Sequence, residues 1–442
     1  MRIAILGGGA TGLTLAYRLG QAGHRCTVFE REAEPGGLAA GTKINGTWLE
    51  KFYHHLFRTD KVATGLIHEL GLGDRLLWLR PTTSNLIGDR AYQLDSPLTL
   101  LRFRPLPPLD RVRLAACIAF LKGEANYHRF EHTAASAWVR RWMGPRVYEV
   151  LMGPLLRSKF GARADDVLMS WLWSRFHERT TKLGYLRFGF QQLYERLVEE
   201  VALQGGTIQL STEVRAVEAL GPGLLRVDAG SRGGAFDVVV SALATRITVR
   251  LVRGLPAWYV DRYSGGDAYG AQCLIVTLDR KFGDVYWLAI NNAGSPFLVL
   301  VEHTNLMPPE DYGGAHILYL GNYLPMSDPR MRLAAEDVLA SYLPYLERIN
   351  PAFKPSWVTS SNLFVAPYAQ PIVTRDFPGR IPPHRTPLPG LYLANMFQVY
   401  PQDRGQNYAI AMAERVAKLI AADVSSGRLS DADASIRGGT KS

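Results

Sequence analysis

The spacing of three glycines near the start of the sequence predicts a binding site for a nucleotide pyrophosphate. Gly7, Gly9 and Gly12 follow the apolar run at residues 2–6 and precede a stretch, residues 13–19, with helical periodicity. In such a strand–turn–helix unit the first glycine permits the tight turn, and the second lets the backbone approach the pyrophosphate. The third glycine lets the helix pack closely against the strand.

The residues around this motif narrow the choice of nucleotide. The N-terminus of the helix supplies free N–H groups and the positive end of the helix dipole, so we include Ala10 and Thr11 in the site. Glu30 ends the next apolar run and is expected, with its neighbour Arg31, at the ribose. A carboxylate there accepts hydrogen bonds from ribose hydroxyls and repels a 2′-phosphate, which disfavours NADP. The spacing alone does not separate NAD from FAD.

A second pair of glycines follows the acid in "EREAEPGGLAAG", residues 30–41. With this pair the sequence resembles the FAD-dependent amine oxidase superfamily, which includes protoporphyrinogen oxidases, phytoene desaturases and UDP-galactopyranose mutases. The resemblance implies FAD as a resident cofactor, with Gly36, Gly37 and Leu38 along its pyrophosphate and ribityl chain. Leu38 stands where the family usually has an arginine.

Two later segments also resemble the family's FAD domain. In "TEVRAVE" the resemblance implies that the backbone of Val214 contacts the adenine end. In "GLYLANMF" Asn395 and Met396 stand where the family has Gly-Asp, and either Asn395 or Asn407 is expected to replace the missing aspartate at the ribityl chain. Gly405, Asn407 and Tyr408 then fall at the start of the last helix, where N–H donors meet the flavin N1–C2=O edge.

The predicted fold class is therefore α/β. It consists of a discontinuous Rossmann-type FAD-binding domain, an inserted α+β substrate domain and a helical lid. The FAD domain is expected at residues 1–60, 186–248 and 386–425. The substrate domain is expected at residues 61–185 and 249–385, and residues 426–442 are expected to form a disordered tail.

The stretch "LEKFYHHLFRTD", residues 49–60, holds the first candidate catalytic residues. The segment from His55 to Thr59 resembles the HxFxT stretch of UDP-galactopyranose mutases, in which the histidine lies close to the flavin. His55 is expected to move a proton or to hydrogen-bond flavin N5 or O4, and Arg58 is the second candidate. If this segment is extended, His54 and His55 point to opposite faces, so at most one meets the ring. A histidine that is simply packed in the fold remains an alternative.

Basic residues supply the other candidates. Arg404 and Tyr408 lie beside the predicted flavin helix, and an arginine there is expected to hold an anionic substrate over the ring. Residues 152–190 combine aromatic side chains with cations, and six of these cations form either a solvated face or a clamp for a phosphate or carboxylate. The six are Arg157, Lys159, Arg175, Arg179, Lys182 and Arg187. No spacing of histidine, cysteine or carboxylate residues predicts a metal site.

Composition bears on the partners and the compartment. The formal net charge of +10 and the basic, apolar stretch at residues 98–123 favour an acidic ligand or an anionic membrane surface, although residues 110–122 are also typical of a lid helix. No basic run or known module points to nucleic acid. Three widely separated cysteines and a strand that begins at Arg2 indicate a reducing compartment without a signal peptide. We expect a cytoplasmic protein, with peripheral contact to the inner face of the membrane as a further option.

Three hypotheses for the function follow. The first is an FAD-dependent oxidoreductase that moves a hydride to flavin N5 from a small-molecule substrate. This substrate is expected to be apolar or lipid-linked, and a negative charge on it is a further option. The second is a flavoenzyme of the UDP-galactopyranose mutase type, which acts on a sugar nucleotide or lipid-linked sugar without net redox change. The third is a flavin-binding protein that serves a partner complex without chemistry of its own.

Overall fold

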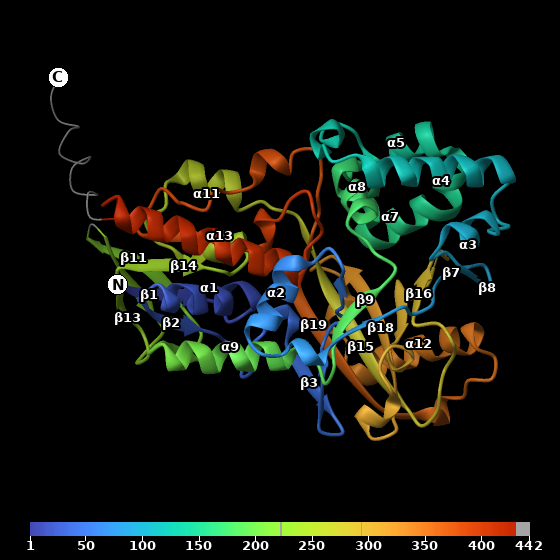
Figure 1. The fold of residues 1–442 in the computed structure, drawn as a ribbon, viewed down its shortest axis with the longest axis horizontal. Helices are drawn as coiled ribbons and strands as arrows, with labels where there is room; N and C mark the ends of the chain where they lie inside the picture. The colour runs from blue at the N-terminus through green and yellow to red at the C-terminus, as the bar shows by residue number, and fades with distance from the viewer. Residues whose placement is uncertain (222, 293, 430–442) are drawn as a thin grey trace.

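The computed structural model describes residues 1–221, 223–292 and 294–429, so most of the tail predicted at residues 426–442 lies outside the described residues. The described chain has two halves that lie side by side along its longest axis (Figure 1). One half is built on a parallel sheet and the other on a large, mostly antiparallel sheet with a group of helices above it. The α/β fold class is confirmed.

The parallel sheet has five strands from three distant parts of the chain. Its order is β10-β2-β1-β14-β20, and every pairing within it is parallel. The strands are β1 (Arg2–Leu6), β2 (Arg25–Phe29), β10 (Thr207–Gln209), β14 (Val238–Ser241) and β20 (Leu391–Leu393). The inner strands are apolar on both faces because both faces of a parallel sheet are covered.

The alternation of side chains along β1 decides what covers each face. Ile3 and Ile5 share a core with residues of the helix α1, whereas Ala4 and Leu6 share one with residues of a small antiparallel sheet. The helices packed with the first of these cores are α1 (Ala10–Gln21), α9 (Gln191–Leu203) and α13 (Gln406–Ser425). The small sheet consists of β11 (Ala216–Gly221), β12 (Leu224–Asp228) and β13 (Gly234–Phe236), and α10 (Thr245–Leu251) and α11 (Ala257–Tyr263) follow β14.

The second half is centred on a seven-stranded sheet of order β19-β15-β18-β17-β16-β7-β8, antiparallel except where β16 pairs with β7. Its strands are β7 (Thr83–Ile87), β8 (Arg90–Gln93), β15 (Ala268–Leu278), β16 (Trp287–Ile290), β17 (Val299–Glu302), β18 (His316–Leu324) and β19 (Val358–Pro371). The helix α12 (Ala335–Ile349) packs on the face that carries Leu274 and Leu318. Ile275 and Tyr319 lie on the opposite face and join the core of the parallel-sheet half.

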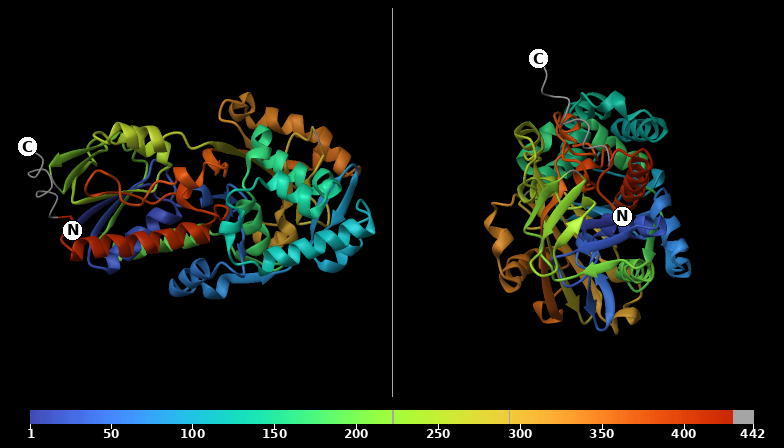
Figure 2. Two further views of the ribbon diagram at one scale, coloured as in Figure 1. Left: turned by 90° about the horizontal axis from the view of Figure 1, so that it is seen from above. Right: turned by 90° about the vertical axis from the view of Figure 1, so that its left-hand side faces the viewer.

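Residues 97–177 form a helical group with a core of its own. In the left-hand view of Figure 2 it lies toward the end away from the N-terminus. The helix predicted at residues 110–122 is α4, which is longer by a few residues at its start because prolines are well tolerated in a first turn. The helices are α3 (Pro97–Leu101), α4 (Pro108–Gly123), α5 (Ala135–Trp138), α6 (Pro145–Val147), α7 (Gly153–Phe160) and α8 (Met169–His177).

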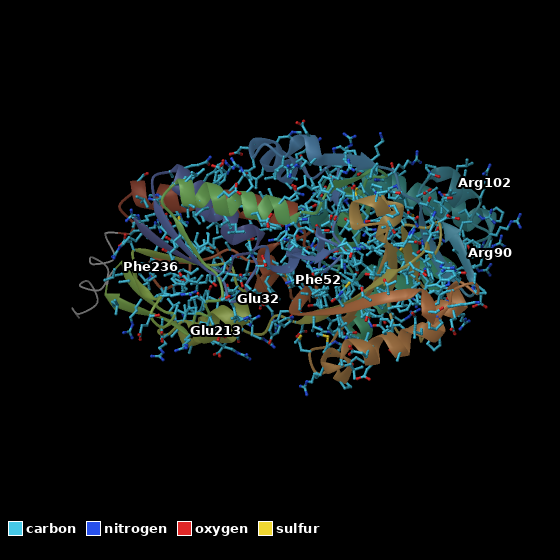
Figure 3. The ribbon with its side chains drawn as sticks, turned by 90° about the horizontal axis from the view of Figure 1, so that it is seen from below. Glu32, Phe52, Arg90, Arg102, Glu213 and Phe236 are labelled. Carbon is cyan, nitrogen blue, oxygen red and sulfur yellow. The ribbon has the colours of Figure 1, made fainter. Side chains whose placement is uncertain are left out.

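Short elements between residues 41 and 79 connect the two halves. They are β3 (Gly41–Ile44), β4 (Thr47–Glu50), β5 (Leu56–Phe57), α2 (Lys61–Glu69) and β6 (Leu76–Leu79), and β9 (Leu183–Leu186) pairs with both β5 and β6. Glu32 and Phe52 lie near the middle of the molecule, where the halves meet, whereas Arg90 and Arg102 lie at the far end (Figure 3). Within the described part of the chain, no helix is long and apolar enough to cross a bilayer.

Candidate active site

The predicted glycine motif forms a tight turn between β1 and α1. Gly7 has a φ of +104°, which favours glycine, and its N–H donates to the carbonyl of Phe29. A Cβ on Gly12 would lie 1.9 Å from the carbonyl oxygen of Gly7, so no side chain fits there. Around Gly9 the nearest atoms to such a Cβ lie at 3.8 Å or more. Gly12 is thus needed for the turn itself, whereas Gly9 leaves space beside it.

The second glycine pair lies directly against the first motif. The N–H of Gly36 donates to the carbonyl of Gly8 at 2.8 Å, and a Cβ on Gly37 would lie 3.1 Å from the Cα of Gly9. Gly36 and Gly37 have φ values of +118° and +59°. We call residues 7–12 and 36–37 the glycine cradle. Its wall is backbone, which suits close contact with a phosphate.

The start of α1 closes one side of the cradle. Gly9 is the N-cap of the helix and offers no side chain to satisfy the first N–H groups, which include those of Ala10 and Thr11. The Thr11 hydroxyl instead donates to the carbonyl of Ala409 at 3.4 Å and so links α1 to α13. The first turn of α1 therefore keeps backbone donors and the positive dipole end for a ligand.

The acid predicted at the ribose lies beside the cradle. The Glu30 carboxylate accepts hydrogen bonds from the N–H groups of Gly8 at 2.7 Å and of Glu32 at 2.9 Å. The Glu30 carbonyl accepts one from the N–H of Thr212, which brings the segment that leads to Val214 alongside it. Arg31, in contrast, is exposed and pairs with Glu32.

The start of α13 packs against α1. Asn407 uses its side-chain oxygen to cap α2, accepting from the N–H groups of Val62 and Ala63 at 3.1 and 3.0 Å. Gln406 accepts from the Tyr194 hydroxyl, but its buried Nε2 has no hydrogen-bond partner among the described residues. Gly405, the N-cap, is exposed.

Asn395 and Met396 lie in the turn that follows β20. The Asn395 side chain is 2% exposed, accepts from the N–H of Phe397 and forms a hydrogen bond with the Thr245 hydroxyl at 3.2 Å. Met396 is half-buried in the same turn. The structure thus places the amide groups of Asn395 and Asn407 in contacts within the protein, and their predicted roles at the ribityl chain remain predictions.

These residues fit FAD. The glycine cradle excludes side chains from a path between α1 and the second glycine pair. Glu30 lies at one end of that path, and the N-terminus of α1, which has no side-chain cap, lies at its start. The buried Gln406 Nε2 and His55 Nδ1 also lack partners in the described chain and suit a polar ring edge. Gly7, Gly9, Ala10, Gly36 and Gly37 would hold the pyrophosphate.

The two adjacent histidines have different surroundings, as the extended chain predicts. His54 Nδ1 lies 2.6 Å from the carbonyl oxygen of Phe52. The His55 ring packs edge to face against Phe57 and Trp287, with centroids 5.2 and 5.7 Å away. Burial and the positive charge of Arg179 lower the pKa of His55 to about 3, so this ring is neutral at physiological pH. The Nδ1 of His55 is thus a buried ring nitrogen without a hydrogen-bond partner among the described residues, on a ring without positive charge.

The structure does not bring Arg58 into this group. Its side chain is exposed and its guanidinium stacks on Trp78, 4.5 Å from the ring centroid. Tyr408, in contrast, is half-buried in the first turn of α13, and burial raises its pKa. Tyr408 therefore stays a neutral phenol close to the predicted cofactor path.

Four cations meet where the helical group faces α13. We call them the cationic cluster: Lys159 from α7, Arg175 from α8, Arg179 just after α8, and Arg404 just before α13. Asp403 is the carboxylate among them, with one oxygen 2.5 Å from Lys159 Nζ and 2.9 Å from Arg175 Nη1.

Neutral groups hold Arg404. It donates to the Tyr323 hydroxyl at 2.7 Å and to the Gln370 side chain at 2.6 Å, both on the large sheet.

The charges of the cluster act on one another strongly because water is largely excluded. Burial lowers the pKa of Lys159 well below its usual range, and the attraction of Asp403 only partly offsets this effect. Burial alone would raise the pKa of Asp403, but Lys159, Arg175 and Arg404 together hold it well below its usual value. Asp403 is thus ionised at any working pH.

The sequence analysis anticipated part of this cluster. Of the six cations that the sequence analysis named between residues 152 and 190, Lys159, Arg175 and Arg179 lie together, although Arg179 is itself exposed. The other three are exposed and lie outside the cluster, so both alternatives hold for different residues. Asp403, Tyr323, Gln370 and Gln406 were missed. Asp403 and Gln406 flank Arg404 and Gly405 in the sequence, which was a usable signal, but no local pattern marks Tyr323 or Gln370.

Comparison with known proteins identifies the class. The model of the family described as flavin containing amine oxidoreductase matches residues 10–419. The chain therefore belongs to this family of flavin-dependent oxidoreductases, and FAD is its cofactor.

Curated relatives match only parts of the chain. The mitochondrial protoporphyrinogen oxidase of Nicotiana tabacum is 24% identical over 172 residues, which is 38% of this chain and 34% of that protein. The 15-cis-phytoene desaturase of Glycine max is 37% identical over 317 residues, 65% of this chain and 55% of that protein. The matches thus span between about a third and about half of these relatives' lengths.

Solved structures agree on the fold over nearly the whole chain. A putative protoporphyrinogen oxidase from Exiguobacterium sp. 255-15 has a TM-score of 0.76 at 18% identity, covering 95% of this chain and 98% of that one. A reduced UDP-galactopyranose mutase has a TM-score of 0.72 at 14% identity, covering 95% and 96%. These similarities define the fold and leave the substrate to the residues of this chain.

Proposed function

We propose that this protein is an FAD-dependent oxidoreductase that removes a hydride from an apolar or lipid-linked substrate held between the glycine cradle and the cationic cluster. The observation that carries the proposal is the position of His55 among Phe57, Trp287 and Tyr286, where aromatic side chains offer an apolar surface. Bound FAD supplies the hydride acceptor at N5.

The residues of the chain would bind and orient. The N–H groups at the start of α13 would stabilise negative charge on the bound flavin. The neutral His55 offers a hydrogen bond without charge, and the aromatic rings around it keep water away from the substrate. Arg404, fixed by Tyr323 and Gln370, orients the substrate.

The absorbance spectrum of the purified protein is the first test. Oxidised-flavin bands that persist through gel filtration, and that bleach under anaerobic conditions with a hydrophobic reductant, support the proposal. A protein that stays colourless after incubation with FAD contradicts it, because the glycine cradle would then serve another nucleotide.

A second candidate is a mutase-type reaction on a sugar nucleotide or lipid-linked sugar, without net redox change. The segment from His55 to Thr59 favours it, since it resembles the HxFxT stretch of UDP-galactopyranose mutases. The two candidates differ in one requirement, because only the mutase needs a flavin that has been reduced with dithionite before it turns over.

We also propose that the outer face of the helical group contacts an anionic membrane. The solvent side of α4 carries large apolar side chains, with Leu109, Val112 and Phe120 exposed by 83%, 59% and 46%. Leu98 and Leu101 on α3 are exposed nearby by 56% and 49%. Exposed cations on and around this face include Arg102, Arg104, Arg113, Lys122, Arg140, Arg141 and Arg146. An apolar stripe with a basic border suits an anionic bilayer surface.

Sedimentation with vesicles tests this proposal. The protein should sediment with phosphatidylglycerol–phosphatidylcholine vesicles and much less with phosphatidylcholine alone. Leu109→Asp should reduce sedimentation, whereas Leu203→Asp, at an exposed leucine on α9, should not. Equal sedimentation of both variants with the unmodified protein would contradict the assignment of this face.

A further inference from the structure

We propose that the substrate carries a carboxylate or phosphate group, and that Arg179 binds this group with the support of the cationic cluster. The inference rests on the proposed function and specifies the substrate class of the same site. It requires a substrate with an apolar body and an anionic end.

The cationic cluster has more positive charge than its protein surroundings balance. Lys159 and Arg175 share the single carboxylate of Asp403. The Arg404 side chain donates its hydrogen bonds to the neutral Tyr323 and Gln370, and the charge of the same Asp403 also acts on it. Within the described residues, Arg179 forms no ion pair. The residue before it, Glu178, is an acid whose negative charge helps to raise the pKa values of Asp60 and Tyr408. Four cations thus face one acid, and buried charges of one sign call for a counter-ion.

Arg179 has the properties of an anion anchor. Its side chain is exposed to solvent four residues after Arg175, just after the end of α8, and it forms no ion pair among the described residues. The guanidinium has a forked set of donors that matches a carboxylate or a phosphate in two parallel hydrogen bonds.

The surroundings of Arg179 have an apolar side. The Arg179 guanidinium lies 5.9 Å from the centroid of Phe57, which packs against His55, and His55 packs in turn against Trp287. A ligand that binds Arg179 therefore has its adjoining part against aromatic rings. This combination favours amphiphilic anions over sugar-like ligands, which need a polar lining.

The arrangement also argues against amines. An alkylammonium group would meet Lys159, Arg175, Arg179 and Arg404 with a single carboxylate, Asp403, that is already paired twice. Like charges at short range in a water-poor site repel strongly. The family name therefore does not extend to the substrate, which we infer to be an anion.

Ligand titrations of the FAD-loaded protein test the inference with simple amphiphiles in place of the substrate. The probes are dodecanoate, dodecyl phosphate, dodecan-1-ol and dodecylamine, below their micelle concentrations, with changes of the flavin absorbance spectrum as the readout. Both anions should bind at least about tenfold more tightly than the alcohol, and the amine should be weakest. Added salt should weaken the anions selectively, because their preference is electrostatic.

Variants then assign the preference to Arg179. Arg179→Gln should remove the anion preference by about tenfold and leave binding of the alcohol unchanged. The matched control is Arg157→Gln, since Arg157 lies on α7 two residues from Lys159 but is exposed. If Arg179→Gln does not fold, the four probes on the unmodified protein still decide the sign of the preference.

Two results would overturn the inference: the alcohol or the amine binds as tightly as the anions, or Arg179→Gln keeps the anion preference. Preference for only one of the two anions distinguishes a carboxylate from a phosphate and supports the inference. These failures are distinct from failure of the proposed function, which shows earlier as a protein that retains no flavin.

Discussion

The glycine cradle takes all its residues from two short stretches, 7–12 and 36–37, whereas the cationic cluster draws Lys159, Arg175, Arg179 and Arg404 from separate elements. The cradle is backbone and carries no side-chain charge beyond Glu30 at its end. The cluster consists of side chains whose charges are only partly balanced. The first region suits a cofactor that is shared by a whole family, and the second suits the substrate of one protein.

The largest effect is expected at the cradle. Gly9→Val should yield folded protein with almost no flavin, because the space beside Gly9 admits a side chain only at the expense of the pyrophosphate path. Gly12→Val should in addition lower the free energy of unfolding by at least about 1–3 kcal/mol, since a Cβ there collides with the Gly7 carbonyl. Flavin content and urea unfolding measure the two effects. A Gly9→Val protein with its full flavin complement would contradict the cradle.

In the cationic cluster, loss of the Asp403 carboxylate should destabilise the fold strongly. Asp403→Asn leaves Lys159 and Arg175 without an ionic partner, and we expect a loss of about 3–5 kcal/mol in the free energy of unfolding. The control is Asp376→Asn, whose ion pair with Arg380 is about half exposed and should cost at most about 1 kcal/mol. Similar losses for the two variants would mean that the cluster is solvated like a surface.

The buried carboxyl of Glu50 should make the free energy of unfolding depend on pH. Glu50 is 1% exposed, accepts from the Phe190 N–H and the Tyr185 hydroxyl, and has its pKa raised by burial to about 7. A raised pKa stabilises the folded state fully below the unfolded value of 4.5, and this contribution is lost as the pH rises through 7. Glu50→Gln should remove a pH-dependent difference of at most about 3 kcal/mol.

Urea unfolding at pH 5 and pH 8 measures this difference for Glu50→Gln and for Glu347→Gln, an exposed control on α12. Only the first variant should flatten the pH dependence of the unfolding free energy. An unchanged slope would mean that Glu50 titrates as it does in the unfolded chain.

The smallest effect is expected at the histidine that joins the two regions. His55→Phe keeps the ring packing against Phe57 and Trp287 but removes the nitrogen that lacks a partner. Flavin content should stay constant, while the rate of flavin reoxidation in air after photoreduction should change by about tenfold. His54→Phe serves as the comparison, since its Nδ1 already contacts the Phe52 carbonyl. Equal changes in both variants would remove the special role of His55.

Much of the cofactor region was readable from the sequence. Gly7, Gly12 and Glu30 act within a single strand–turn–helix–strand unit, so the local pattern already contains the geometry. The expectation for Arg58 was less informative, because it came from a short segment that resembles another enzyme, and such a segment does not say which neighbour will cover a side chain. Trp78, on a strand that pairs with β9, provides that contact.

By itself, the sequence determined the α/β class, the family and the cofactor, because glycine spacing and strand–helix alternation encode backbone paths over short distances. Only the tertiary structure decided which of the basic residues between 152 and 190 act together. Lys159, Arg175 and Arg179 become one site with Arg404 because α7 and α8 pack where the chain returns just before α13. The interactions of a charged side chain depend on how far its neighbours exclude water, and here those neighbours come from parts of the chain that are far apart in sequence.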